Sequence, residues 1–413
     1  MAERLIIRNF AGIDEIDIEL GRINIFIGAQ ASGKSICVKC LYYFKGCINS
    51  LLRQAIQPRL PVENLDSLFE AGFSVMFDET AFQSNSILRY SDGENFIQIV
   101  SNGRQIKATY SNFYADLFNR ARKAVTSRVA SSPEEEAFSD TAIYVRFKQA
   151  AAQALGTFGT STLLFVPASR AAYSLVGEPR SDDQFSIDPF VNNFRPFYAA
   201  FKRSESLARA ELRNSIIKRL TAEVLQAEFL RLKEDEFIIQ VPDTPVPLSV
   251  ASSGQQEVLP VVLTLRYLAL AARIEPEIAI IEEPEAHLHP TAQNALAQLM
   301  SAVYNTRKAP LQLFLTTHTP YLLTAFNNLI YAGQLADTLQ DDAPGLAKLE
   351  AVVPKELRLN LADFRVYGLE NGRATLMIDE ETGLLRADSL DSVSDVTADQ
   401  FGDLMALDPA IHS

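Results

Sequence analysis

The stretch GAQASGKS, from Gly28 to Ser35, most constrains the fold of this chain, because it matches the pattern G-x-x-x-x-G-K-[ST]. The apolar run RINIFIG before it predicts a β-strand, and the run KSICVKCLYYF after it has helical periodicity. A glycine-rich loop between a strand and a helix turns several N–H groups toward one phosphate chain, and the helix adds its positive end. The stretch therefore predicts a nucleotide-binding α/β domain.

Each position of this phosphate loop has an expected role. Lys34 is expected to reach the β- and γ-phosphates, and the Ser35 hydroxyl is expected to bind Mg²⁺. The remaining positions are expected to line the phosphates with their backbone. The full predicted cradle is Gly28, Ala29, Gln30, Ala31, Ser32, Gly33, Lys34, Ser35 and Ile36.

Two acids follow a buried strand in the segment IAIIEEPEAHLHP. The carboxyl end of that strand is expected to face the phosphate loop. There Glu282 would reach Mg²⁺, through water, and Glu283 would orient and activate the attacking water. Two adjacent acids at a strand end can also be a solvated surface, although the apolar run Ile278 to Ile281 that leads into them favours the catalytic interpretation.

Two further segments are candidates for contact with the nucleotide phosphates. His318 ends the apolar strand LQLFLTTH, and the order strand, acids, helix, strand, histidine predicts a γ-phosphate sensor rather than a structural histidine. The segment SVASSGQQE, Ser249 to Glu257, precedes a long apolar helix. Small residues at a helix start can bind an anion, but Ser-Ser-Gly is also a plain helix N-cap.

The elements along the chain predict an α/β fold with four parts. Residues 1–111 contain short antiparallel strands and the phosphate loop, and residues 112–236 form a helical insertion with a core strand near 162–169. Residues 237–336 read strand, helix, strand, which implies parallel strands. Residues 337–413 form a short acidic C-terminal extension with a hairpin at FRVYGLENGRATLMID.

The four motifs in this order resemble the ATP-binding-cassette (ABC-type) P-loop ATPases. ASSGQ, from Ala251 to Gln255, stands where that family has its LSGGQ signature. The segments RNFAGIDEIDIELGRINIFIGAQASGKS, IEEPEAHLHP and THTPYLL resemble more closely the OLD-like branch, related to RecF and SMC proteins. The resemblance implies ATP and Mg²⁺ as cofactors, ATP hydrolysis as the activity, and a homo-dimer or higher homo-oligomer. In it, Ser252, Ser253, Gly254 and Gln255 of one subunit would bind the nucleotide of the other.

The chain departs from the family pattern at several positions. Glu282 replaces the aspartate of many cassette ATPases, and Ser253 replaces a signature glycine. The Q-loop glutamine is not identified, although Gln98 and Gln105 lie in the right region. Arg170 ends a P-x-x-R segment that resembles one near the site of OLD-like ATPases. The sequence leaves two roles open for Arg170: a phosphate-facing or interface role, and a structural ion pair.

The resemblance also suggests a biological setting. Too few residues follow His318 for the Toprim nuclease domain of OLD nucleases, so we expect a separate effector, such as a Toprim-like or HNH nuclease, in an anti-phage defence complex. One alternative is a RecF/SMC-type DNA-repair ATPase that acts directly on DNA. Another is a scaffold that binds ATP without turnover. DNA contact through the basic stretches 120–128 and 202–219 is possible.

Composition narrows these alternatives. The formal net charge of −13 argues against a protein that coats nucleic acid by bulk electrostatics. Three clustered cysteines, Cys37, Cys40 and Cys47, build no disulfide framework. Cys37 and Cys40 form a C-x-x-C, but no second Cys or His pair stands at metal spacing, so we expect a buried helix rather than a zinc site. The N-terminus lacks the apolar segment of a signal peptide, and no run is long enough to span a membrane. We therefore expect a cytoplasmic protein without membrane contact.

Overall fold

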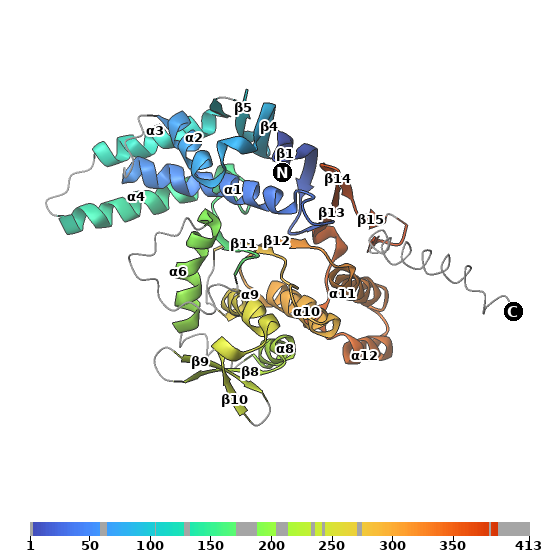
Figure 1. Cartoon of the computed structure of the whole chain (residues 1–413). Coiled ribbons are helices and arrows are strands. Elements are labelled where there is room, and N and C mark those ends of the chain that lie inside the picture. Colours follow the sequence, from blue (N-terminus) through green and yellow to red (C-terminus); the bar gives the residue numbers. More distant parts are fainter. Residues whose placement is uncertain are drawn as a thin grey trace.

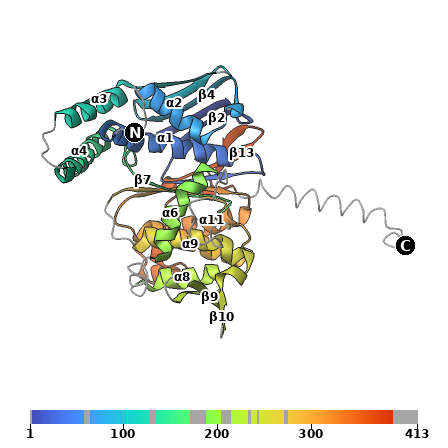
Figure 2. The same cartoon turned by 60° about the vertical axis from the view of Figure 1, so that its left-hand side comes forward.

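The computed structural model describes residues 3–57, 64–103, 105–127, 133–170, 188–203, 214–232, 236–241, 244–270, 275–379 and 381–386. Within these residues an eleven-stranded sheet lies between two layers of helices (Figures 1 and 2). In order across the sheet, its strands are β6 (Ile106–Tyr110), β5 (Asn95–Ser101), β4 (Phe82–Asp92), β1 (Glu3–Phe10), β2 (Ile13–Leu20), β14 (Arg373–Leu376), β13 (Phe364–Glu370), β3 (Ile23–Ile27), β12 (Leu311–Thr317), β11 (Glu277–Glu282) and β7 (Thr162–Val166).

The sheet has an antiparallel half and a parallel half. Strands β6, β5, β4, β1 and β2 are joined by antiparallel pairings, whereas β13, β3, β12, β11 and β7 run parallel. This arrangement confirms the predicted α/β fold with N-terminal antiparallel strands and a parallel core. Two small sheets accompany it. The first consists of β8 (Glu228–Leu232), β9 (Glu236–Val241) and β10 (Thr244–Pro247), and the second of β15 (Ile378–Asp379) and β16 (Leu384–Leu385).

The C-terminal hairpin enters the middle of the central sheet. β13 pairs in parallel with β3 and antiparallel with β14, so the hairpin predicted at FRVYGLENGRATLMID is confirmed. From sequence this hairpin is expected in a C-terminal extension, and its position in the sheet is not predicted. In the structure it separates β2 from β3, although these two strands follow each other directly in the chain.

Helices cover both faces of the sheet. One layer contains α1 (Lys34–Ile56), α2 (Leu65–Met76), α3 (Asn112–Thr126) and α4 (Pro133–Ala154). The other contains α8 (Ser215–Leu225), α9 (Ser253–Leu270), α10 (Pro290–Thr306) and α11 (Pro320–Thr338). The remaining helices are α6 (Pro189–Arg203), α12 (Ala343–Val352) and the 3₁₀ turns η1 (Glu79–Ala81), η2 (Leu248–Val250), η3 (Lys355–Leu357) and η4 (Leu361–Asp363).

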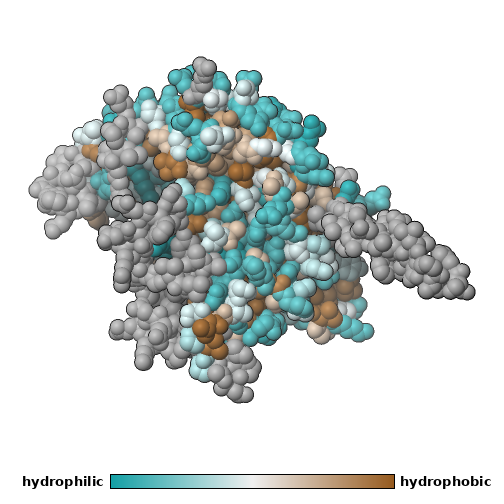
Figure 3. All heavy atoms as spheres, viewed as in Figure 1, coloured by the Kyte–Doolittle hydropathy of each residue, from teal (hydrophilic) through white to brown (hydrophobic). Residues whose placement is uncertain are grey.

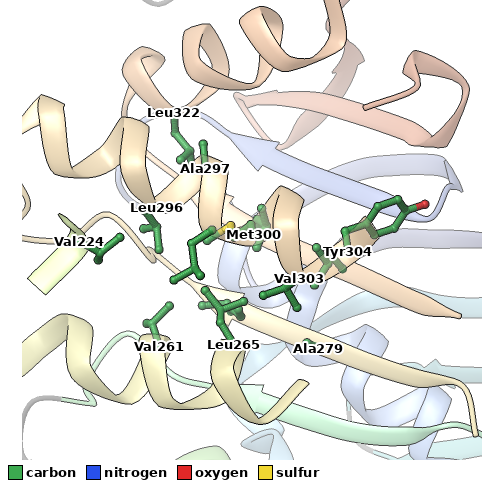
Figure 4. Close-up of a cluster of buried hydrophobic side chains, with 14 of the residues drawn as sticks. Val224, Val261, Leu265, Ala279, Leu296, Ala297, Met300, Val303, Tyr304 and Leu322 are labelled. Carbon is green, nitrogen blue, oxygen red and sulfur yellow. The ribbon is translucent and has the colours of Figure 1, made fainter. Parts of the chain in front are cut away.

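Two apolar cores result from the alternation of side chains along the parallel strands. Ile25 and Ile27 of β3 point into the core under α9 and α10, whereas Phe26 between them points into the core under α1. Figure 4 shows part of the first core, where Leu265 of α9 and Met300 of α10 meet over β11. Strands buried on both faces read as continuous apolar runs, which is why β11 and β12 were recognisable in the sequence.

The cysteines lie on the buried side of α1, as predicted. Cys37, Cys40 and Cys47 are free and buried, and burial raises the pKa of Cys37 and of Cys47 to about 12. These thiols therefore stay protonated at neutral pH and act as small apolar side chains.

Three observations concern the surface of the described residues. Figure 3 shows hydrophilic and hydrophobic residues interspersed over one face, and no described helix is long and apolar enough to cross a membrane. In the first basic stretch, the guanidinium groups of Arg120 and Arg122 lie over the rings of Phe147 and Phe118. Arg128 and most of the second stretch, including Arg209 and Arg213, lie outside the described residues.

Candidate nucleotide site

The carboxyl ends of the parallel strands lie in register along one edge of the sheet. Ile27, the last residue of β3, is opposite Thr317 of β12 and Gly368 of β13. On the next strand, Glu282 of β11 is opposite Thr316. The loops that follow these strands therefore meet at one place, which is the usual position of a ligand site in an open α/β sheet.

The phosphate loop, residues 28–35, has a backbone that only glycine adopts easily at two positions. Gly28 has a φ of 153° and Gly33 a φ of 99°. A Cβ on Gly28 would also overlap the carbonyl oxygen of Leu369, at the end of β13. The hairpin of β13 and β14 thus packs against the loop at Gly28. Helix α1 begins directly after Gly33, with its N-terminal amides at the loop.

Lys34 lies inside this loop. Its Nζ donates to the carbonyl oxygens of Gly28 at 2.8 Å and Ala29 at 2.6 Å, and to Ser32 Oγ at 3.3 Å. Burial lowers the pKa of Lys34, while the nearby carboxylates of Glu283 and Glu285 act in the opposite direction. The ammonium group is therefore bound to backbone oxygens of the loop and lies near the two acids that follow β11.

Glu282 and Ser35 meet beside the loop. Glu282 is 3% exposed, and its Oε2 accepts from the N–H of Ala168 at 3.2 Å. Burial raises the pKa of Glu282, and hydrogen bonds from the Ser35 hydroxyl and Ala168 oppose this effect. Among the described residues, Oε1 of Glu282 has no hydrogen-bond partner. A buried carboxylate oxygen beside a serine hydroxyl fits Mg²⁺, which prefers oxygen ligands and keeps several waters.

Glu283 and His318 form a pair across the ends of β11 and β12. Nε2 of His318 lies 2.7 Å from Oε1 of Glu283, and Nδ1 of the same ring lies 3.0 Å from the carbonyl oxygen of Gly28. Both side chains are about one-third exposed. Glu283 has a φ of 42°, and its N–H donates to the carbonyl oxygen of Thr316 at 3.0 Å. The pair thus stands next to the phosphate loop and remains accessible to water.

A third acid, Glu285, was not identified from the sequence. Its Oε1 accepts from the hydroxyl of Thr317 at 2.6 Å and from the N–H of His318 at 3.0 Å. Burial raises the pKa of this carboxyl group. Glu285 therefore fixes the backbone that carries His318. The only sequence signal for Glu285 was its place in EEPE, two residues after Glu283. Nothing in the sequence indicated that its side chain is buried.

The signature segment, residues 251–255, lies at the start of α9. The Ser252 hydroxyl accepts from the N–H of Gln255 at 3.3 Å, which is the N-cap arrangement. Ser252 and Ser253 are exposed, and Gln255 donates to the carbonyl oxygen of Leu225 at 2.9 Å. Among the described residues, no hydrogen bond joins this segment to the phosphate loop of the same chain.

Among the described residues, Arg170 forms no hydrogen bond to the phosphate loop and no side-chain ion pair. It is 0% exposed, and within the described part of the chain its guanidinium donates only to backbone carbonyl oxygens. Gln98 and Gln105 also lie away from the site: Gln98 is on β5, and five strands separate β5 from β3. Gln105 is in the turn before β6, where its N–H donates to Asn102. Neither is placed to act as a Q-loop residue.

Comparison with known protein families gives a match. A family model described as "AAA domain, putative AbiEii toxin, Type IV TA system" matches residues 23–324. No curated protein matches the chain significantly.

Solved structures show remote similarity. The Smc head bound to the C-winged helix domain of ScpA is 12% identical, with a TM-score of 0.43, covering 91% of this chain and 96% of that chain. The SMC head domain from Thermotoga maritima is 12% identical, with a TM-score of 0.37 and coverages of 92% and 99%. The Smc head domain with an extended coiled coil, bound to the C-terminal domain of ScpA derived from Pyrococcus furiosus, is 10% identical, with a TM-score of 0.39 and coverages of 96% and 99%.

The family model covers most of the chain, including the phosphate loop, Glu282, Glu283, the signature segment and His318. The protein therefore belongs to the family of AAA-domain ATPases that this model describes.

Proposed function

We propose that this protein binds ATP with Mg²⁺ at the carboxyl edge of β3, β11 and β12, and hydrolyses it. The observation that carries the proposal is the position of Glu283. Its carboxylate is hydrogen-bonded to His318, whose ring also contacts the phosphate loop at Gly28. A partly exposed carboxylate beside a phosphate loop is where a water-activating base is needed.

Each residue then has a separate task. Lys34 and the loop amides bind the phosphates, and Ser35 with Glu282 holds Mg²⁺, which neutralises charge on the phosphates when bound. Glu283 accepts a proton from the attacking water. His318 orients the Glu283 carboxylate and lies where it can donate to the γ-phosphate. Glu285 keeps His318 in place through the Thr317–His318 backbone.

The signature segment supports a homo-dimeric arrangement. Ser252, Ser253, Gly254 and Gln255 stand at a helix N-terminus, where N–H groups and the helix dipole favour an anion. In the described part of the structure they make no hydrogen bond to the phosphate loop of their own chain. We propose that they contact ATP bound by a second copy in a head-to-tail dimer.

We further propose that this ATPase controls a separate effector in an anti-phage defence complex. The OLD-like resemblance of the sequence supports this proposal, and so does the reference to an AbiEii toxin and a Type IV TA system in the family description. ATP binding would close the dimer, and hydrolysis would reopen it and change the state of a nuclease or toxin.

The variant Glu283→Gln tests both levels of the proposal. It removes the base but keeps a hydrogen-bonding side chain of the same shape, so it should bind ATP and remain dimeric without releasing phosphate. We would purify the tagged variant from its native host and identify bound proteins by mass spectrometry, with Lys34→Ala as the control that does not bind ATP. A stoichiometric nuclease or toxin, present only with Glu283→Gln, supports effector control. Chromosomal DNA and repair factors instead favour a RecF-type function, and unchanged turnover contradicts the catalytic assignment.

A further inference from the structure

Arg170 connects two parts of the site through one rigid group. Its Nε donates to the carbonyl oxygen of Glu257, in the first turns of α9, at 2.7 Å. Its two terminal nitrogens donate to the carbonyl oxygens of Glu282 at 2.6 Å and Glu283 at 2.7 Å, at the end of β11. A planar guanidinium fixes the relative positions of the groups it bonds. The signature helix and the catalytic acids are therefore held together.

A second contact joins the same two parts. Gly254 of the signature segment packs on the backbone of His287, in the loop after β11, and a Cβ on Gly254 would lie 2.7 Å from the His287 carbonyl oxygen. The start of α9 is thus close to the loop after Glu283 at two independent points. A displacement of the signature segment would therefore act on this loop through both contacts.

The backbone of Glu283 is sensitive to such a displacement. Its φ of 42° is rare for residues other than glycine, and the flanking hydrogen bonds hold it there. Arg170 supplies one of these bonds. A change in the position of Arg170 would therefore alter the direction of the Glu283 carboxylate, and with it the contact to His318.

We propose that Arg170 is a positioning residue that makes hydrolysis at one ATP site depend on occupancy of the other. The inference rests on the proposed function, including the head-to-tail dimer. In that dimer the signature of a chain contacts the ATP of its partner, whereas Glu283 of the same chain serves its own ATP. Arg170 lies between them and transmits the state of the partner's site to Glu283.

Mixed dimers test this coupling. One chain carries Lys34→Ala and binds no ATP, and the other is either wild type or Arg170→Lys. In the wild-type mixed dimer the signature of the active chain meets an empty site, so its turnover per active site should fall at least about 5-fold below that of the wild-type homodimer, the lower end of usual couplings. For Arg170→Lys, mixed dimer and homodimer should have the same turnover per active site.

The ratio of turnover per active site between homodimer and mixed dimer distinguishes positioning from general structural damage. A damaged chain loses activity by the same factor in both dimers, so its ratio stays that of wild type. Lysine keeps the charge but has three donors on one atom and cannot bridge these carbonyls. The matched control is Arg307→Lys. Arg307 is also buried, and it joins the other end of α9, at the Leu268 carbonyl oxygen, to Glu277 at the start of β11. Its ratio should equal that of wild type.

Three results decide the proposal. If the two Arg170→Lys dimers differ as the wild-type dimers do, Arg170 does not couple the sites. If Arg170→Lys does not fold, Arg170→Gln, which keeps two N–H donors, is measured in the same way, and a wild-type ratio there overturns the inference. If the wild-type homodimer does not form or does not hydrolyse ATP, the proposed function fails and the coupling with it. The ATP affinity of the Arg170→Lys and Arg170→Gln homodimers, measured with a fluorescent ATP analogue, should differ from that of wild type by less than about 2-fold. This measurement separates a loss of coupling from a loss of ATP binding.

Discussion

Nε2 of His318 lies 2.7 Å from Oε1 of Glu283, while Nδ1 of the same ring lies 3.0 Å from the carbonyl oxygen of Gly28. One imidazole thus bridges the acid at the end of β11 and the phosphate loop after β3. The two strands that carry these groups are not sheet neighbours, because β12 lies between them. His318 follows β12 and lies between them, and under the proposed function this bridge stands where the γ-phosphate and the attacking water would meet.

Replacing Glu283 by glutamine should lower kcat for ATP hydrolysis by at least about 100-fold, because general-base catalysis typically contributes 10² to 10⁴-fold. ATP affinity should remain within a few-fold, since Lys34 and Ser35 are untouched. Phosphate release at saturating ATP and equilibrium binding of a fluorescent ATP analogue measure the two effects. A parallel loss of binding and turnover would instead indicate that Glu283 supports the loop.

Replacing His318 by alanine should lower kcat by about 100-fold, in the range seen when one transition-state hydrogen-bond donor is removed. His318→Asn, which keeps a donor but is shorter, should retain more activity than alanine. Steady-state kinetics of both variants give the comparison. Equal activity of wild type and His318→Ala would show that the Glu283–His318 contact has no part in turnover.

Replacing Gly28 by alanine should damage both the fold and nucleotide binding. The added Cβ would overlap the carbonyl oxygen of Leu369, and a φ of 153° is unfavourable for alanine. Together these should cost about 2–4 kcal/mol of unfolding free energy. Gly103→Ala is the matched control, since Gly103 also has a positive φ, of 86°, but nothing lies within 4 Å of its Cβ. Denaturant unfolding should show a clearly smaller loss for the control.

The buried pair Glu3–Lys45 should contribute to stability in a pH-dependent way. Lys45 Nζ lies 2.7 Å from Glu3 Oε1, and Tyr90 and Gln312 also donate to this carboxylate. Burial alone would raise the pKa of Glu3, but the Lys45 charge and these hydrogen bonds outweigh it and lower the pKa. The stabilisation is therefore complete above the unfolded pKa of about 4.3 and is lost as pH falls through the lower folded value.

Glu3→Gln removes this titration, so its stability relative to wild type should improve as the pH falls below about 4. Lys45→Met leaves Glu3 buried without its partner and should cost about 3–5 kcal/mol at pH 7. Urea unfolding across pH 3–7 measures both effects. Identical pH profiles for wild type and Glu3→Gln would contradict a native carboxylate in this position.

The sequence by itself determined those parts of the site that short stretches of adjacent residues specify. The glycine spacing of residues 28–33, the apolar strands ending in Glu282 and His318, and the helix after Lys34 are local patterns. They fix which strands are buried and which end carries the polar groups, and the α/β fold follows from their order. The assigned roles of these residues remain predictions for the experiments above.

Only the tertiary structure decided which distant segments complete the site. β13 lies beside β3 and supports Gly28, although more than 300 residues separate them in the chain. Glu285 bonds to the backbone of His318, and Arg170 bonds to the carbonyl oxygens of Glu257 on α9 and of Glu282 and Glu283 at the end of β11. Backbone carbonyls are present at every position, so no residue pattern marks those that a buried arginine binds. Such contacts arise from the order of strands in the sheet, which local periodicity does not encode.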